Sequence, residues 1–179
     1  MQDVIAERAA IDKAVSGKTV CTIFNEAVTK WGDKPALHWK ENGDTRTLTW
    51  RGYRDEVAAV TLALRSLGFG PGQFGLIMAR NAPEHVIADL GIVHAGGAAI
   101  SVYNTLAPEQ IEYVANHSEA TVAFVEDEGF LEKFLAIRSS TPKLRHLVLV
   151  RGSAPEGVIT WESLVAKGRE MHAAEPKAF

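Results

Sequence analysis

The sequence contains a single cysteine, Cys21, among 179 residues. One cysteine excludes an internal disulfide framework and a cysteine-rich metal site. No histidine lies near it in a motif that would indicate a catalytic thiol. We therefore expect Cys21 to act as a small apolar residue on the inner face of a helix.

Long apolar runs are also missing. No stretch of 18 apolar residues occurs, so the sequence predicts no transmembrane segment. The first residues have neither the basic region nor the apolar region of a signal peptide. The expected location is the cytoplasm, either free or peripheral to a membrane.

Charge of one sign is nowhere concentrated. The net charge is −3, and acidic and basic residues are interleaved along the chain. Without a run of Lys and Arg, binding to nucleic acid has no electrostatic support. Hydrophobic residues make up 46% and charged residues 23%, which is typical of a globular domain with a real core.

The common catalytic motifs do not occur either. The sequence has no GxxxxGKS or GxxxxGKT, no GxSxG, no HExxH and no CxxC. The glycine-rich Gly68–Gly72 follows a predicted helix and precedes a predicted strand, which is the wrong context for a phosphate loop. His85 and His94 are nine positions apart on one helix, so they do not have the spacing of paired metal ligands. The sequence thus predicts no catalytic residue and no metal site.

Helix signals dominate the first third of the chain. Residues 1–18 are predicted to form a short helix, and Thr19 is expected to cap a second one. Asn42-Gly43 lies between two strand-like runs and predicts a hairpin. Thr49 is expected to cap a long helix that ends at Gly68 and buries one stripe, made of Tyr53, Val57, Val60, Leu64 and Leu67.

Strands and helices alternate through the rest of the chain. Predicted strands cover 74–79, 98–102, 121–125 and 145–150. Helices between and after these strands are expected to begin at Asn81, at Thr105, at Asp127 and at residue 161, and the last should end near residue 170. The helix at Asn81 is predicted to have a capping box with Glu84. Its buried residues should be Val86, Ile87, Leu90 and Val93. Residues 171–179 read as a loop or linker. This alternation predicts an α/β fold with a largely parallel sheet, helices on both faces, and an N-terminal helix and hairpin in front.

One loop is a candidate binding site. Tyr103, Asn104 and Thr105 follow a predicted strand at the edge of the sheet where ligands usually bind. They offer an aromatic ring, an amide and a hydroxyl next to a helix N-terminus, a combination that suits an anionic or nucleotide-like ligand. The alternative is that Thr105 only caps and Tyr103 only packs, and spacing alone favours this alternative.

A family resemblance runs from residue 19 to about residue 165. In order, these segments resemble the opening of AMP-forming acyl-CoA synthetases, and most closely long-chain fatty acid–CoA ligases: Thr22-Ile23-Phe24, Pro35-Ala36-Leu37, Leu48-Thr49-Trp50, Arg80-Asn81-Ala82-Pro83-Glu84, Gly91–Ala98, Val102–Leu106 and Pro108–Tyr113. No single segment is diagnostic, but the ordered set is specific.

The resemblance implies a two-step ligase. A fatty acid reacts with ATP and Mg²⁺ to give acyl-AMP and pyrophosphate, and coenzyme A then displaces AMP. The groups that carry this chemistry lie further along the family's sequence, so the resemblance assigns no catalytic residue to this chain. It matches Tyr103–Thr105 to the place where relatives line the approach of coenzyme A or the acyl chain.

The resemblance also implies a division of the chain. Residues 1–18 would be an N-terminal extension, 19–170 the first segment of the large AMP-binding domain, and 171–179 a linker toward the phosphate-loop region. We expect the isolated chain to be catalytically incompetent, to bind ATP, Mg²⁺ or coenzyme A at most weakly, and to self-associate through apolar surface. Two alternatives remain: a truncated, non-catalytic binding or scaffold module of the same fold, and an unrelated flavodoxin-like domain.

Overall fold

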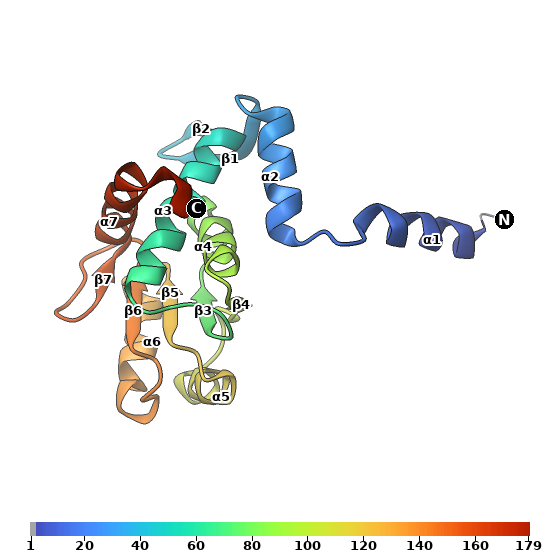
Figure 1. Ribbon diagram of the computed structural model, residues 1–179. Coiled ribbons are helices and arrows are strands. Elements are labelled where there is room, and N and C mark those ends of the chain that lie inside the picture. Colours follow the sequence, from blue (N-terminus) through green and yellow to red (C-terminus); the bar gives the residue numbers. More distant parts are fainter. Residues whose placement is uncertain (1–2) are drawn as a thin grey trace.

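The computed structural model describes residues 3–179 and contains a five-stranded parallel sheet (Figure 1). The strand order is β4-β3-β5-β6-β7. The strands are β3 (Phe74–Met78), β4 (Ala98–Ser101), β5 (Val122–Val125), β6 (His146–Leu149) and β7 (Ile159–Thr160). The predicted fold class is therefore confirmed. The short edge strand β7 was not predicted, because two residues are too few for a period to show.

Helices cover both faces of this sheet. Alternate residues of the central strands point to opposite faces: Ile77 and Phe124 belong to one core, and Leu76 and Ala123 to the other. The first core contains α3 (Trp50–Ser66), α4 (Pro83–His94) and α7 (Trp161–Ala174), and the second contains α5 (Pro108–Ser118) and α6 (Glu128–Ala136). Burial on both faces explains why β5 reads as the unbroken apolar run VAFV.

Helix α3 is buried more completely than its sequence predicts. Every residue from Val57 to Leu64 is buried, because α2 (Val20–Trp31), α4 and α7 all contact this helix. Glycines allow the close approach: a Cβ at Gly168 would lie 1.8 Å from the carbonyl oxygen of Ala59. The hydroxyl of Thr61 donates to the carbonyl oxygens of Val57 and Gly91, at 2.7 and 3.2 Å, so even its polar group is satisfied.

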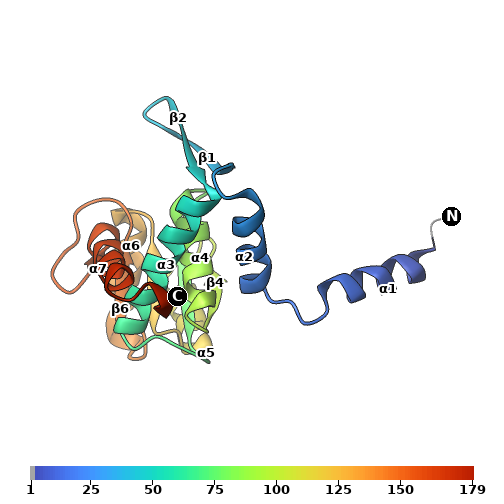
Figure 2. The same cartoon turned by 45° about the horizontal axis from the view of Figure 1, so that its top comes forward.

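The N-terminal helix α1 (Val4–Val15) projects away from the rest of the chain (Figures 1 and 2). None of its residues is buried, and Asp3 caps it by accepting from the backbone N–H groups of Ile5 and Ala6. The predicted helix is confirmed. Thr19 caps α2 as predicted, and Cys21 is half-buried on that helix.

A hairpin joins α2 to α3. Strands β1 (Pro35–Glu41) and β2 (Asp44–Thr49) pair antiparallel around Asn42 and Gly43. Both turn residues have positive φ, +51° and +87°, as a type I′ turn requires. Thr49 then accepts from the N–H of Gly52 at 3.1 Å, which confirms the predicted cap of α3.

Two predicted helix caps are wrong, and proline is the reason in both places. Helix α4 begins at Pro83 after Ala82, so Asn81 is not its cap; α5 begins at Pro108 after Ala107, so Thr105 is not its cap. A residue before proline is held in extended backbone, which moves the helix start to the proline itself.

The buried face of α4 also differs from the prediction. Ile87 is buried as expected, but Val86 is 39% exposed and Leu90 and Val93 are only partly buried. The inward residues are instead Ile87, Ala88, Gly91 and Ile92. Small residues face α3 because the two helices pack closely.

The C-terminal residues are more ordered than the sequence suggests. Helix α7 continues to Ala174 rather than ending near residue 170, and a 3-10 turn (Pro176–Ala178) follows; another lies at Arg138–Ser140. The expectation of a loop for these residues is therefore wrong. The role of 171–179 as a linker stays a prediction.

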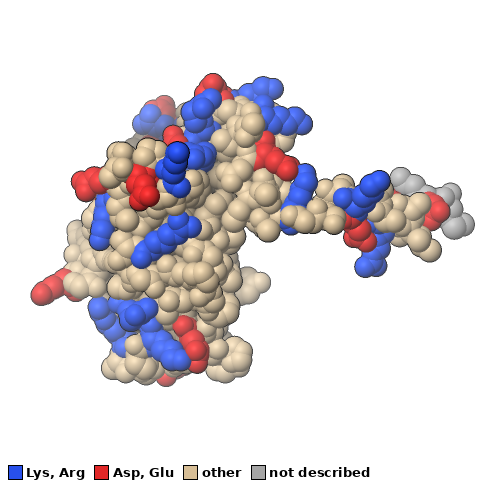
Figure 3. Space-filling model, viewed as in Figure 1, with Lys and Arg blue, Asp and Glu red and all other residues tan. Residues whose placement is uncertain are grey.

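Charged side chains of both signs are interspersed over the face shown in Figure 3. None of the helices within residues 3–179 is both long and apolar enough to cross a membrane.

Candidate functional site

The carboxyl ends of the strands meet at one edge of the sheet, and charged residues follow three of them. Arg80 comes after β3, Glu126 and Asp127 after β5, and Arg151 after β6. Together with Glu84 of α4, these residues form one network that we call the edge cluster.

Glu126 is the centre of the edge cluster. Glu126 is only 7% exposed. Its carboxylate accepts from the backbone N–H of Arg80 at 2.6 Å and from Nη1 of Arg151 at 3.1 Å. Nη2 of Arg151 donates to Glu84 at 2.9 Å. A buried carboxylate is stable only when it is paired and hydrogen-bonded, and Glu126 meets this condition by tying three elements together.

Asp127 pairs with Arg80 at the surface of the same cluster. Nη1 of Arg80 donates to Asp127 at 2.7 Å, and this hydrogen bond lowers the pKa of the aspartate and raises the pKa of the arginine. Asp127 also accepts from the N–H of Phe130 at 3.0 Å, which confirms it as the predicted cap of α6. The guanidinium of Arg80 lies over the ring of Phe130, 4.7 Å from its centroid.

An open cavity of about 700 Å³ lies beside this cluster, lined by Arg80, Asp127, Glu128, Gly129, Phe130, Lys133, Arg151 and Gly152. Both signs of charge line it. Among residues 3–179, no group of three or more His, Cys, Asp and Glu side chains is placed to hold a metal ion.

The candidate loop Tyr103–Thr105 lies at this edge, after β4. Nζ of Lys133 donates to the carbonyl oxygens of Asn104 and Leu106, both at 2.9 Å, and so fixes the loop's backbone. Tyr103 is 79% exposed, so the alternative that its ring only packs against the core is wrong. The loop therefore carries an exposed aromatic ring on a fixed backbone. Lys133, which the sequence analysis did not predict as a site residue, holds this loop against the wall of the open cavity.

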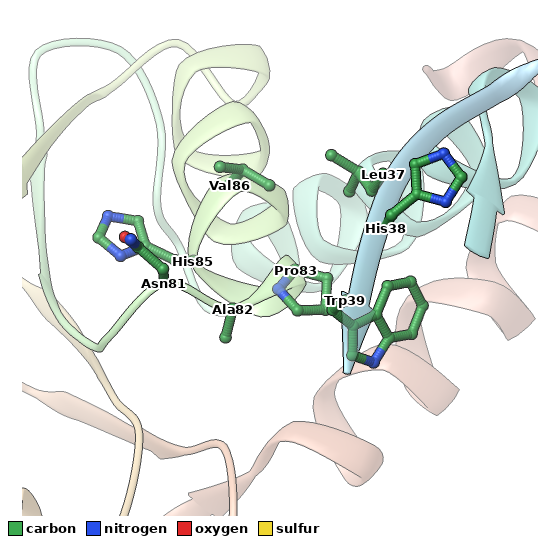
Figure 4. A pocket seen from close by; sticks show the side chains of 8 residues that line it. All are labelled: Leu37, His38, Trp39, Asn81, Ala82, Pro83, His85 and Val86. Carbon is green, nitrogen blue, oxygen red and sulfur yellow. The ribbon is translucent and has the colours of Figure 1, made fainter. Parts of the chain in front are cut away.

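A second cavity, of about 340 Å³, separates the hairpin from the start of α4 (Figure 4). Leu37 points toward Val86, and Pro83 lies next to Trp39, so the lining is mainly apolar. Both histidines in the lining have other partners: His38 meets Thr47 at 2.9 Å and His85 meets Ser101 at 3.3 Å. The described residues that line this cavity do not form a convergent set of polar groups that would orient a ligand.

The class of protein is thus a parallel α/β domain, and its exposed loops gather at the carboxyl ends of the strands. The chain belongs to the family of AMP-binding enzymes, whose sequence pattern matches residues 24–178. The resemblance to AMP-forming ligases is therefore confirmed.

Curated relatives include long-chain-fatty-acid–CoA ligases. The chain is 35% identical over 132 residues to ACSBG2 of Gallus gallus, covering 73% of this chain and 17% of that protein. It is 28% identical over 156 residues to ACSBG2 of Xenopus laevis, covering 86% and 21%. The chain thus spans about a fifth of the length of these ligases.

The chain is also similar to a shorter relative and to a solved structure. The uncharacterised protein Rv1549 of Mycobacterium tuberculosis is 30% identical over 153 residues, covering 86% of this chain and 84% of that protein. The crystal structure of the anthranilate CoA ligase AuaEII in complex with anthranoyl-AMP superposes with a TM-score of 0.72 at 27% identity, covering 80% of this chain and 27% of that one.

Proposed function

We propose that this chain provides the N-terminal part of a long-chain fatty acid–CoA ligase, which joins a fatty acid to coenzyme A through acyl-AMP at the expense of ATP. The observation that carries the proposal is the family match over residues 24–178 together with relatives of that named activity. In this proposal the chain supplies a wall of the ligand path, and the reacting groups come from other parts of the enzyme.

Tyr103–Thr105 is the part of that wall that we assign to coenzyme A. Its support is the exposed ring of Tyr103 and the backbone held by Lys133 at 2.9 Å. An exposed aromatic ring on a fixed loop can stack on an adenine base. We assign neither ATP nor Mg²⁺ to residues of this chain. The glycines of Gly68–Gly72 connect α3 to β3, and no group of three or more His, Cys, Asp and Glu side chains within residues 3–179 is placed to hold a metal ion.

The isolated chain should not activate a fatty acid. We expect no ATP–pyrophosphate exchange by the purified 179-residue chain with palmitate, ATP and Mg²⁺. Exchange above the enzyme-free blank would contradict this part of the proposal.

Binding of coenzyme A tests the loop separately. In NMR titrations we expect weak binding with shifts centred on Tyr103–Thr105. Tyr103→Ala should weaken it about fivefold or more, the usual cost of losing a stacked base. Tyr113→Ala is the matched control, because Tyr113 is also exposed, at 68%, but stacks on His117. Equal effects of the two substitutions would remove the loop from the proposal.

A second function deserves a test because of Rv1549, which this chain matches over 84% of its length. A relative of similar size supports a small, non-catalytic module that binds coenzyme A, acyl chains or a partner. Such a module must bind by itself, so micromolar affinity for coenzyme A or palmitoyl-CoA would favour it. Millimolar affinity would favour the ligase segment.

A further inference from the structure

Lys133 of α6 lines the open cavity beside the edge cluster and has no carboxylate partner within residues 3–179. The other two cations of the cavity lining, Arg80 and Arg151, each form two ion pairs with carboxylates. We propose that Lys133 binds the phosphate group on the ribose of coenzyme A, an inference that rests on the coenzyme A site proposed at Tyr103–Thr105.

The ammonium group of Lys133 keeps one donor for a ligand. Nζ carries three N–H donors. Two of them donate to the carbonyl oxygens of Asn104 and Leu106, both at 2.9 Å, and the third has no partner in the described part of the chain. Lys133 is half-buried and lines the open cavity, so a ligand in the cavity has access to its side chain.

The turn Tyr103–Leu106 places this ammonium group next to an aromatic ring. The N–H of Leu106 donates to the carbonyl oxygen of Tyr103 at 3.1 Å and closes the turn. Lys133 binds the carbonyl oxygens of the second and fourth residues of the turn, and the exposed ring of Tyr103 extends from the first. This combination suits a nucleotide, because the base can stack on the ring while a phosphate pairs with the cation.

The carboxylates that line the cavity are engaged elsewhere. Asp127 accepts from Nη1 of Arg80 at 2.7 Å, and Glu128 accepts from the backbone N–H of Ser153 at 2.6 Å. The lining contains three cations and two carboxylates, so its net charge is positive. The cation without an ion pair within residues 3–179 is Lys133, and an anion is therefore expected to bind there.

The ribose phosphate is the group of coenzyme A that best suits a single ammonium. A phosphate monoester carries about −1.5 to −2 charge at pH 7 and three strong acceptor oxygens. Each phosphate of the internal diphosphate is linked on both sides and carries less charge. Lys133 should therefore distinguish coenzyme A from dephospho-coenzyme A, which lacks the ribose phosphate.

NMR titrations of the 179-residue chain with these two ligands test the assignment. Both ligands should shift the resonances of Tyr103–Thr105. Coenzyme A should bind about tenfold more tightly, the effect of one hydrogen bond between charged groups. Equal affinity for both ligands would overturn the role of Lys133 and leave the loop as a binding site. No shift at the loop with either ligand would overturn the coenzyme A site itself, and the role of Lys133 with it.

A substitution separates a phosphate contact from a loss of order in the loop. Lys133→Met removes the ammonium group, so the loop should loosen and both ligands should bind more weakly, but the tenfold preference should disappear. Lys143→Met is the matched control, because it removes the same charge from a lysine that pairs with Glu119 at 2.7 Å and does not line the cavity. An equal preference in the two variants would overturn the proposal. The comparison of the two ligands on the unsubstituted chain does not depend on the folding of either variant.

Discussion

The edge cluster contains two arginines, and two others, Arg54 and Arg65, line a cavity of about 390 Å³ among α2, α3, α4 and the C-terminal residues. With His94, which also lines that cavity, we call them the cavity cluster. The two pairs of arginines meet different partners. Arg80 and Arg151 each contact carboxylates, and the central one, Glu126, is buried. Arg54 and Arg65 contact backbone carbonyl oxygens, a phenylalanine ring and one adjacent aspartate.

This difference separates two uses of the same side chain. Arginines paired with fixed carboxylates hold charged loops together, whereas Arg65, which donates to the carbonyl oxygens of Ala178 and His94, ties neutral backbone to α3. The edge cluster thus braces the loops after β3, β5 and β6, and the cavity cluster holds the C-terminal residues against α3 and α4.

The largest effect is expected at Glu126. Glu126→Ala removes a buried carboxylate and leaves the N–H of Arg80 without its acceptor, which should cost about 3 kcal/mol in urea unfolding. Glu41→Ala is the control, because its pair with Arg46 is half-exposed on both sides and such pairs contribute about 0–1 kcal/mol. A cost below about 1 kcal/mol at Glu126 would show that the edge cluster is not a structural brace.

A smaller effect is expected at Asp127, which caps α6 and pairs with Arg80. Asp127→Ala should cost about 1 kcal/mol through the lost cap, and Asp127→Asn less, because an amide oxygen still accepts from Phe130. Asp3→Ala removes the equivalent cap of α1 and should leave global unfolding unchanged, because α1 buries none of its residues. Equal costs at Asp127 and Asp3 would mean that α1 is part of the cooperative unit.

Local signals in the sequence predicted most of the fold. The caps Thr19, Thr49 and Asp127 are predictable from residue type alone, because a cap is a local interaction: each side chain accepts from the backbone N–H three positions further along. Asn81 and Thr105 failed because the prolines after them decide where the helices begin. The pattern of apolar residues predicts four of the five strands of the parallel sheet. It cannot predict the full burial of α3, because that depends on the three helices packed around it.

The clusters were not predictable for a related reason. Arg151 meets Glu84 across 67 positions, and Arg65 meets Ala178 across 113. Periods and caps carry no information over such distances. The one available signal was that Arg80, Glu126 and Arg151 each follow a strand within two positions, so a parallel sheet brings them to one edge.

A difference in the slope of stability against pH distinguishes the two clusters most directly. Burial lowers the pKa of His94 below the ordinary value of 6.5, so the unfolded chain binds the proton first. Stability is then lost as the pH falls below about 6.5, by at most about 1.4 kcal/mol per pH unit for one group. The pKa of Asp127 is lowered from 3.8 by Arg80, so its contribution is present above that value and lost only as the pH falls below it.

Urea unfolding from pH 7 to pH 3 should therefore show two separate windows. His94→Gln should flatten the slope between pH 6.5 and 5, and Asp127→Asn should flatten only the slope below about pH 4. His146, whose pKa burial also lowers, keeps part of the upper slope in both variants. The quantity compared is the slope of the unfolding free energy against pH. A loss of packing in His94→Gln lowers the free energy at every pH and leaves this slope unchanged. A single slope that both substitutions flatten equally would mean that the two clusters titrate as one network and that the distinction between them is wrong.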